Sequence, residues 1–196
     1  MGYLLFILLN LLIISLLLSV IKNGKWKRFA VAFRTSTIAF GIGFFTYWFA
    51  QKSMDKFMKD AMAVQIINEL PQPLDFYIIT VERGAEEKIY KTRHIGKVRM
   101  DHYRLDYLKM SKSNEFWLVG YIGKNVSYFT RQFVPNKNID QIITINNYTI
   151  EDESILDIAK EYIDVYKQSD VRYSVWISMA LLLLFINIGL FVKIPE

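Results

Sequence analysis

Cysteine is absent from the 196-residue chain, and histidine occurs only twice. The lack of cysteine excludes disulfides, thiolate nucleophiles and cysteine-based metal sites. An external domain without cysteine is common in bacteria and less expected in a eukaryotic secretory compartment, where disulfides form readily. Together with the long apolar segments described below, this absence favours a bacterial inner (plasma) membrane as the location of the protein.

Catalytic signatures are also lacking. The sequence holds no HExxH, P-loop, GxSxG or SxxK motif. His94 and His102, with Asp101 beside the second, are the only residues that offer two imidazoles and a carboxylate. A predicted turn at Gly96 would pair His94 with residues just after the turn rather than with His102, which counts against a metal site. The sequence therefore predicts a non-enzymatic protein with no catalytic residue, cofactor or metal.

Three long apolar runs dominate what is present. Residues 3–21, 29–50 and 173–192 carry almost no charge, and each has close to the 20 or so residues that a helix needs to cross a bilayer. The first run lacks a basic start and a cleavage site of small residues, so we interpret it as a permanent anchor. We expect two transmembrane helices in residues 1–50 and a third in residues 173–196.

Acidic residues are almost confined to the middle of the chain. Residues 51–172 contain 18 Lys and Arg and 18 Asp and Glu, so this segment has no net charge. The charge of +5 comes from six basic residues beside or within the apolar runs, less Glu196; the six are Lys22, Lys25, Lys27, Arg28, Arg34 and Lys193. Short basic loops stay in the cytoplasm. The loop 22–28 and the C-terminal tail are therefore predicted to be cytoplasmic, and residues 51–172 extracytoplasmic. The opposite orientation is the less favoured alternative.

The second and third apolar runs are predicted to continue as helices beyond the membrane. Residues 51–70 have no Pro or Gly and place apolar side chains at helical spacing, which predicts a helix that extends the second span. Thr149 begins an approximate capping box, and an apolar stripe follows it. This pattern predicts a helix over residues 150–169 that runs into the third span.

Between these helices, residues 74–148 alternate between β-rich runs and turn signals. Short links favour antiparallel neighbours, and Gly123-Lys124 suits a two-residue type II′ hairpin. The fold class predicted is an α+β membrane protein, in which three transmembrane helices carry an antiparallel sheet of about six strands on helical extensions of spans 2 and 3. The predicted strands are residues 74–81, 88–95, 97–110, 116–122, 126–134 and 141–148.

Polar and small residues inside the apolar runs are candidate contacts within the membrane. An intramembrane arginine such as Arg34 marks a functional site by default, but its place six residues after Arg28 favours a side chain that reaches the headgroups. Asn187 lies toward the same side as Arg34, which makes these two the preferred pair. Asn10, or the face formed by Gly41 and Gly43, is predicted to contact another polypeptide. The candidate contact residues are Asn10, Arg34, Gly41, Gly43 and Asn187.

The predicted sheet is basic, whereas its flanks are acidic. Residues 88–137 have a net charge of +8, and residues 51–87 and 138–172 have net charges of −3 and −5. Internal pairing between these segments is the favoured interpretation. The alternative is a surface that binds an anionic lipid or polymer. Its candidate residues are Arg93, Lys97, Arg99, Arg104 and Lys109.

The function predicted from these features is that of a non-enzymatic accessory or scaffold subunit in a bacterial inner-membrane complex for envelope transport, secretion or motility. A self-assembling membrane effector or pore-type protein of a toxin or defence system is one alternative. A binding module for anionic lipid or glycopolymer is the other. The expected partners are membrane lipids and other membrane subunits, identical or different, and not nucleic acid.

Overall fold

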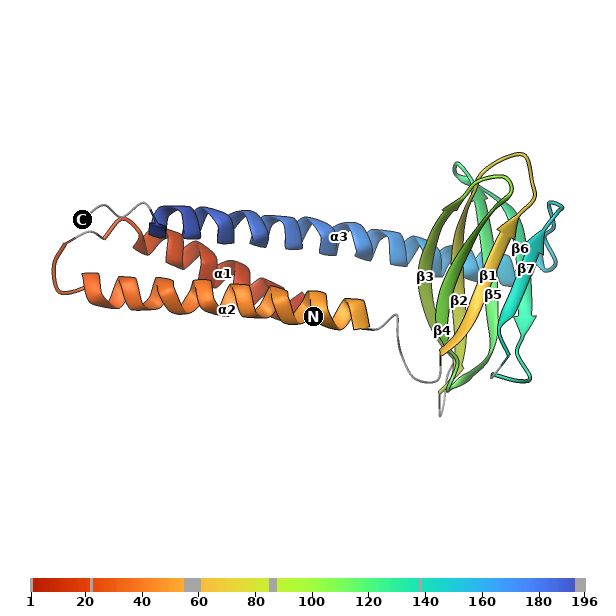
Figure 1. Ribbon diagram of the computed structural model, residues 1–196, viewed down its shortest axis with the longest axis horizontal. Helices are drawn as coiled ribbons and strands as arrows, with labels where there is room; N and C mark the ends of the chain where they lie inside the picture. The colour runs from red at the N-terminus through yellow and green to blue at the C-terminus, as the bar shows by residue number, and fades with distance from the viewer. Residues whose placement is uncertain (1, 22, 55–60, 85–87, 138, 193–196) are drawn as a thin grey trace. The chain divides into compact units, whose positions relative to one another are not determined.

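The computed structural model describes residues 2–21, 23–54, 61–84, 88–137 and 139–192. It is an α+β structure with two sheets and three helices, two of which are long and apolar (Figure 1). The chain divides into two compact units. The helical unit comprises Met1–Ser53 and Gln168–Glu196, and the β unit comprises Met54–Lys167.

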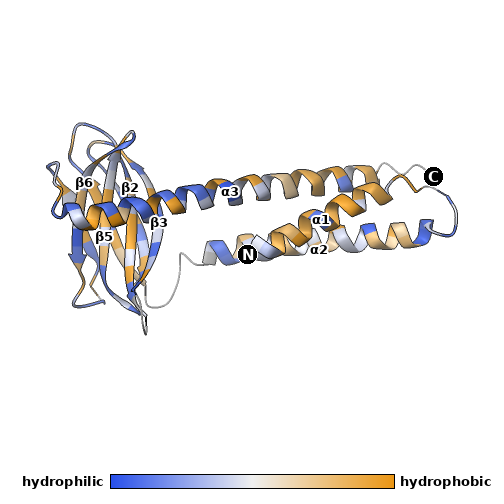
Figure 2. Ribbon diagram, turned by 180° about the vertical axis from the view of Figure 1, so that it is seen from behind, coloured by the Kyte–Doolittle hydropathy of each residue, from blue (hydrophilic) through white to orange (hydrophobic). Residues whose placement is uncertain are grey.

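The helical unit contains α1 (Gly2–Leu18), α2 (Lys27–Met54) and the C-terminal part of α3 (Glu153–Val192). Most large apolar side chains of these helices are exposed, and Figure 2 shows the apolar character along them. By length and composition, α2 and α3 can each cross a membrane, whereas α1 is a shorter apolar helix of 17 residues. The small buried core consists of Leu8, Leu12, Phe45, Ala180 and Leu184.

The helix predicted over residues 51–70 is wrong in its second half. Helix α2 ends at Met54, and residues 55–60 lie outside the described part of the chain. Ala61–Asn68 is strand β1. Met62, Val64 and Ile66 alternate along β1 and are all fully buried. The segment therefore follows the two-residue period of a strand and not the helical spacing. The predicted helical extension of the second span is therefore not present over residues 61–68.

The β unit is built from two sheets rather than one. β1 lies between β4 (His102–Lys109) and β7 (Gln141–Ile145), in the order β4-β1-β7. The second sheet has the order β3-β2-β5-β6. Its strands are β2 (Leu74–Arg83), β3 (Lys88–Val98), β5 (Ser113–Ile122) and β6 (Asn125–Phe133). The β1–β7 pair is parallel, which corrects the prediction of an antiparallel sheet of about six strands.

The β3-β2-β5-β6 sheet is buried on both faces. One face of β2, with Phe76 and Ile78, packs into a core shared with β1 and β4. The other face, with Tyr77 and Ile79, packs against the start of α3. Strands covered on both faces read as continuous apolar runs, which explains the sequence of β2 and β5. The residues that α3 contributes to this second core are Leu156, Ala159 and Ile163.

Several local predictions are tested by the turns and caps. Gly123 has a φ of 62° between β5 and β6, and Ile122 faces Asn125, so the two-residue hairpin is confirmed. Gly96 lies inside β3, with a φ of 99°, and the chain turns later, where Asp101 has a φ of 55°. The predicted turn at Gly96 is therefore wrong.

The last helix begins later than predicted, although it continues into the third apolar run as predicted. Asp152 caps α3, because its Oδ1 accepts hydrogen bonds from the backbone N–H groups of Ser154 (3.0 Å) and Ile155 (3.2 Å). Ile150 instead forms a parallel bridge with Phe129 of β6, so Thr149 does not begin the helix. From Glu153 onward α3 is continuous to Val192, as predicted.

Candidate functional site

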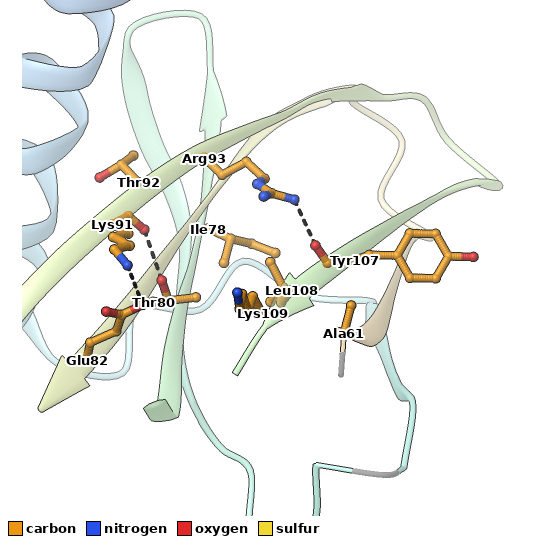
Figure 3. Close-up of a pocket in the computed structure, with 10 residues that line it drawn as sticks. All are labelled: Ala61, Ile78, Thr80, Glu82, Lys91, Thr92, Arg93, Tyr107, Leu108 and Lys109. Atoms are coloured by element: carbon orange, nitrogen blue, oxygen red, sulfur yellow. Dashed lines mark hydrogen bonds and ion pairs between the residues drawn. The ribbon is translucent and has the colours of Figure 1, made fainter. Parts of the chain in front are cut away.

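A pocket of about 450 Å³, lined by both charged and apolar residues, opens in the β unit beside β3 and β4 (Figure 3). The register explains its chemistry. Arg93 pairs with Ile78 and Lys91 with Thr80, so these β3 residues share the β2 face that turns toward the other sheet. β3 is an edge strand, and its inward side chains there are cations instead of core residues. The lining residues are Ala61, Ile78, Thr80, Glu82, Lys91, Thr92, Arg93, Tyr107, Leu108 and Lys109.

Two of the three cations in this pocket already have acceptors. Nζ of Lys91 lies 2.7 Å from Oε1 of Glu82. Nη1 of Arg93 donates to the backbone oxygen of Tyr107 at 2.7 Å and lies 3.5 Å from a carboxylate oxygen of Asp106. Lys109 forms no ion pair with any residue that the structure describes. The pocket therefore offers one uncommitted cation and two that an anionic ligand would share with existing partners.

The structure does not gather the five predicted anion-binding residues into one site. Only Arg93 and Lys109 line the pocket. Arg104 of β4 donates to the backbone oxygen of Ile95, and an added Cβ at Gly96 would collide with the Arg104 guanidinium. Lys97 and Arg99 are exposed, in β3 and in the turn after it. Gly96 thus leaves the space that the Arg104 guanidinium occupies, and its positive φ is a conformation that glycine adopts without strain.

Internal ion pairs among the described residues involve three of the eleven Lys and Arg residues in 88–137, namely Lys91, Arg93 and Arg131, and their acidic partners belong to strands rather than to the flanking helices. Glu115 of β5 binds Arg131 of β6 through both carboxylate oxygens and accepts the indole N–H of Trp117 at 2.6 Å. Burial raises the pKa of Glu115, but the hydrogen bonds from Arg131 and Trp117 outweigh it and hold that pKa below its ordinary value.

The two histidines do not form a joint site. His94 of β3 lies 2.7 Å from Asp75 and stacks on Tyr77, with 4.6 Å between the ring centroids. His102 of β4 lies in the other sheet and contacts the backbone oxygen of Met100 at 2.7 Å. Among the described residues, no group of three or more histidine or carboxylate side chains is placed to hold a metal ion.

A second feature, which sequence reasoning missed, is an apolar face on the β4-β1-β7 sheet. Tyr103, Leu105 and Tyr107 point to the side of β4 opposite its core residue Leu108. Tyr103 is 65% exposed, Leu105 is 50% exposed, and Ile142 of β7 is 67% exposed. We call these four residues, with half-buried Gln65 and Ile67 of β1, the outer face. The alternation of apolar residues in β4 was the signal that could have revealed it.

The candidate contacts in the helical unit are mostly made inside the unit. Asn187 is buried, accepts a hydrogen bond from the Ser15 hydroxyl (2.8 Å) and donates to the backbone oxygen of Leu12 (3.1 Å). Its partner is therefore α1 and not Arg34, which corrects the predicted pair. Gly41 lies against α3, because a Cβ there would come within 3.0 Å of the Leu184 side chain.

The remaining candidates in the helical unit differ in exposure. Asn10 is exposed and donates to the backbone oxygen of Phe6 in its own helix. An added Cβ at Gly43 would meet no atom within 4 Å among the described residues. Arg34 is only 4% exposed, so its side chain is buried among the helices. The prediction that it extends to the surface is therefore wrong.

No family model matches this sequence, and neither a curated protein nor a solved structure matches it. The arguments below accordingly depend on the residues and their geometry.

Proposed function

We propose that the chain is a membrane-anchored, non-enzymatic accessory subunit of a bacterial inner-membrane complex, and that its β unit binds another protein through the outer face. The observation that supports this most is the difference between the two sheets. Helix α3 covers the outward side of the β3-β2-β5-β6 sheet, whereas the β4-β1-β7 sheet leaves Tyr103, Leu105 and Ile142 exposed. Contiguous exposed apolar surface of this kind marks interaction sites.

Membrane anchoring is supported by the surface of the helical unit. Its outward side chains are large and apolar, among them Phe6, Phe40 and Phe185. In water each such side chain would cost about 25 cal/mol for every Å² of apolar surface, whereas lipid tails solvate it. The connection between α1 and α2 includes Lys25, and Lys27 and Arg28 follow in the first turn of α2. This basic cluster favours a cytoplasmic connection and an extracytoplasmic β unit.

The partner that fits the outer face is a protein with a flat apolar surface. Aromatic side chains with few rotatable bonds, such as Tyr103 and Tyr107, provide large contact areas at low entropic cost and are enriched in protein interfaces. Gln65 offers a polar group in the middle of the face. Of the polar groups that would favour a pore, Asn187 and Asn10 give no such support, because Asn187 is bonded within the unit and Asn10 to its own helix.

The test is a comparison of partner capture from the native membrane. The full chain is cross-linked in cells, extracted and purified, and the proteins recovered are compared for the parent, Leu105→Ser and Tyr103→Ser. We expect both variants to lose the same specific partner. Tyr148→Ser is the matched control, because Tyr148 is 51% exposed but lies outside β4, β1 and β7. Equal recovery of partners with Leu105→Ser and the parent would contradict the proposed interface.

The pocket beside β3 and β4 supports a second candidate function, the binding of an anionic polymer or headgroup. Lys109 is the cation of this pocket with no ion pair among the described residues. Binding of dextran sulfate to the full chain should weaken severalfold in Lys109→Gln. Lys124→Gln, in the hairpin after β5, removes the same charge elsewhere and should have little effect. If the two variants bind equally well, the pocket is not the site.

A further inference from the structure

Arg34 is the one described residue whose buried side-chain nitrogens lack hydrogen-bond partners. It belongs to α2 and is 4% exposed. Within the described part of the chain, its Nε and Nη2 atoms are buried and make no hydrogen bond. The guanidinium lies over the ring of Phe191 of α3, 5.7 Å from the ring centroid. A cation–π contact of this length returns only a small part of what burial of the charge costs.

The helical unit has almost no acidic residue that could neutralise this charge. An arginine side chain stays protonated in proteins, so the charge is not removed by loss of a proton. The sequence has no Asp or Glu in residues 1–54 or 171–195. Asp170 is 21 residues before Phe191 along α3, which corresponds to roughly 30 Å of helix. Glu196 lies outside the described residues.

The two unpaired nitrogens define the geometry of the missing group. Nε–H and Nη2–H lie on the same edge of a guanidinium and point in parallel, which is the arrangement that binds two oxygens of a phosphate or carboxylate at once. Arg34 is seven residues, or about 10 Å, from the start of α2 at Lys27. Lys25, Lys27 and Arg28 add positive charge at that end of the helix. An anion that enters from this end would meet four cations.

We propose that Arg34 binds the phosphodiester of an anionic phospholipid, which enters between the helices at the Lys27 end of α2. Basic pockets between transmembrane helices on the cytoplasmic side are suited to such headgroups. The inference rests on the proposed membrane anchoring, and it adds a defined lipid class and a defined residue to it. Lys27 and Arg28 attract the headgroup by charge, whereas Arg34 holds two of its oxygens.

The test uses the full chain in a neutral detergent, titrated with short-chain phosphatidylglycerol. Bound lipid is counted by native mass spectrometry, and the thermal unfolding midpoint is followed in parallel. Loss of a bidentate charge-assisted contact should weaken binding about 10- to 100-fold in Arg34→Gln. Arg34→Lys, which keeps the charge but not the fork, should give an intermediate loss. Lys52→Gln is the matched control, because Lys52 lies in the last turn of the same helix and its removal should change binding less than about twofold.

The remaining arms separate other sources of the anion. Phosphatidylcholine, in which the choline offsets the charge of the phosphodiester, and inorganic phosphate, which has no acyl chains, should at equal concentration bind far more weakly than phosphatidylglycerol and raise the unfolding midpoint less. Equal losses in Arg34→Gln and Lys52→Gln, or stabilisation by inorganic phosphate alone, would overturn the proposal. The proposal would also fail if the parent and Arg34→Gln bound phosphatidylglycerol equally weakly while Glu196→Gln bound it tightly. Glu196 would then be the anion that pairs with Arg34 in the parent.

An alkaline carbonate wash of membranes keeps this result distinct from the proposed function. If the chain stays in the membrane and Arg34→Gln still binds phosphatidylglycerol normally, the lipid site fails while the membrane anchor stands. Release of the parent chain by carbonate would instead contradict the membrane anchor itself.

Discussion

Arg34 and Arg131 both lie over a phenylalanine ring, but they differ in exposure and in their carboxylate partners: Arg34 is 4% exposed, whereas the Arg131 side chain is 34% exposed. Each guanidinium lies over a phenylalanine ring, at 5.7 Å for Arg34 over Phe191 and 4.6 Å for Arg131 over Phe133. Arg131 also binds both carboxylate oxygens of Glu115, whereas Arg34 has no acid beside it among the described residues. Arg131 thus has a carboxylate partner from its own unit. The helical unit has almost no acidic residue, and Arg34 has no ion pair among its described residues.

The same contrast holds for apolar packing. The β unit buries large side chains of both sheets in one core, including Phe76, Phe116 and Ile66. The core of the helical unit is small, and most of its large apolar side chains face outward. In water, burial drives the packing of the β unit. In the proposed membrane location that driving force is missing between the helices, so van der Waals contacts and a few polar bonds must hold them together.

The largest effect on stability is expected when a core side chain of β1 is shortened. Ile66 is fully buried, so Ile66→Ala should destabilise the β unit by about 3 kcal/mol. Hydrogen exchange on the full chain, followed peptide by peptide, should show faster exchange in the strands and little change in α1 and α2. Ile67→Ala, one residue further on and only half-buried, is the matched control and should cost less than about 1 kcal/mol. Equal effects of both substitutions would argue against the strand assignment of residues 61–68.

The second effect is from loss of the paired acid. Glu115→Gln removes charge-assisted hydrogen bonds from Arg131 and Trp117 and should cost about 2 kcal/mol at neutral pH. The folded state lowers the pKa of Glu115 below 4.5, so this stabilisation is fully present above about pH 4.5 and is lost as the pH falls through the lower, folded-state pKa. Urea unfolding at several pH values should therefore show a gap between parent and variant that is constant near neutrality and shrinks in acid. A gap that grows in acid would contradict the lowered pKa.

The third effect concerns the polar bond inside the helical unit. Asn187→Leu removes the contacts with Ser15 and the Leu12 backbone, and polar contacts between membrane helices contribute about 1 kcal/mol each. The thermal midpoint of the detergent-solubilised chain should fall by a few degrees. Ser15→Ala should reproduce about half of this loss, because it removes one of the two contacts. A loss in Asn187→Leu without one in Ser15→Ala would assign the stability to the backbone contacts.

Periodicity and turn residues predicted most of the strands between residues 74 and 145, because each has a local signal. β1 was missed, since Met62, Val64 and Ile66 fit a period of two while the same segment also fits helical spacing. The choice between them depends on β4 and β7, which come much later in the chain. The second sheet follows from that pairing, so it was not accessible from local pattern. The alternation of Tyr103, Leu105 and Tyr107 pointed to an apolar side of β4, but the partners of β4 in the outer face follow only from the pairing.

The candidate sites show the same limit. The excess of cations in residues 88–137 was visible in the sequence, but the register decides that Arg93 and Lys109 share a pocket while Lys97 and Arg99 do not. Arg34 was visible as an intramembrane charge. Its burial depends on how α1, α2 and α3 pack, which no local rule supplies.

The smallest effect is expected for substitution of Asn10. This substitution tests whether the exposed Asn10 amide bonds to another subunit. The sequence predicts that Asn10 contacts another polypeptide, but in the structure its amide donates at 2.8 Å to the Phe6 backbone oxygen of the same helix. Asn10→Leu should therefore change the stability of the helical unit by no more than about 0.5 kcal/mol and leave the size of the detergent-solubilised species unchanged.

Gly41→Leu is the opposite control for Asn10→Leu, because any side chain at Gly41 meets Leu184 and should disturb the packing of α2 against α3. Light scattering after size exclusion measures the mass of both variants. A lower mass with Asn10→Leu, while the helical unit itself stays stable, would show that this exposed amide also bonds across a subunit interface. Such a result would support self-assembly of the protein through α1.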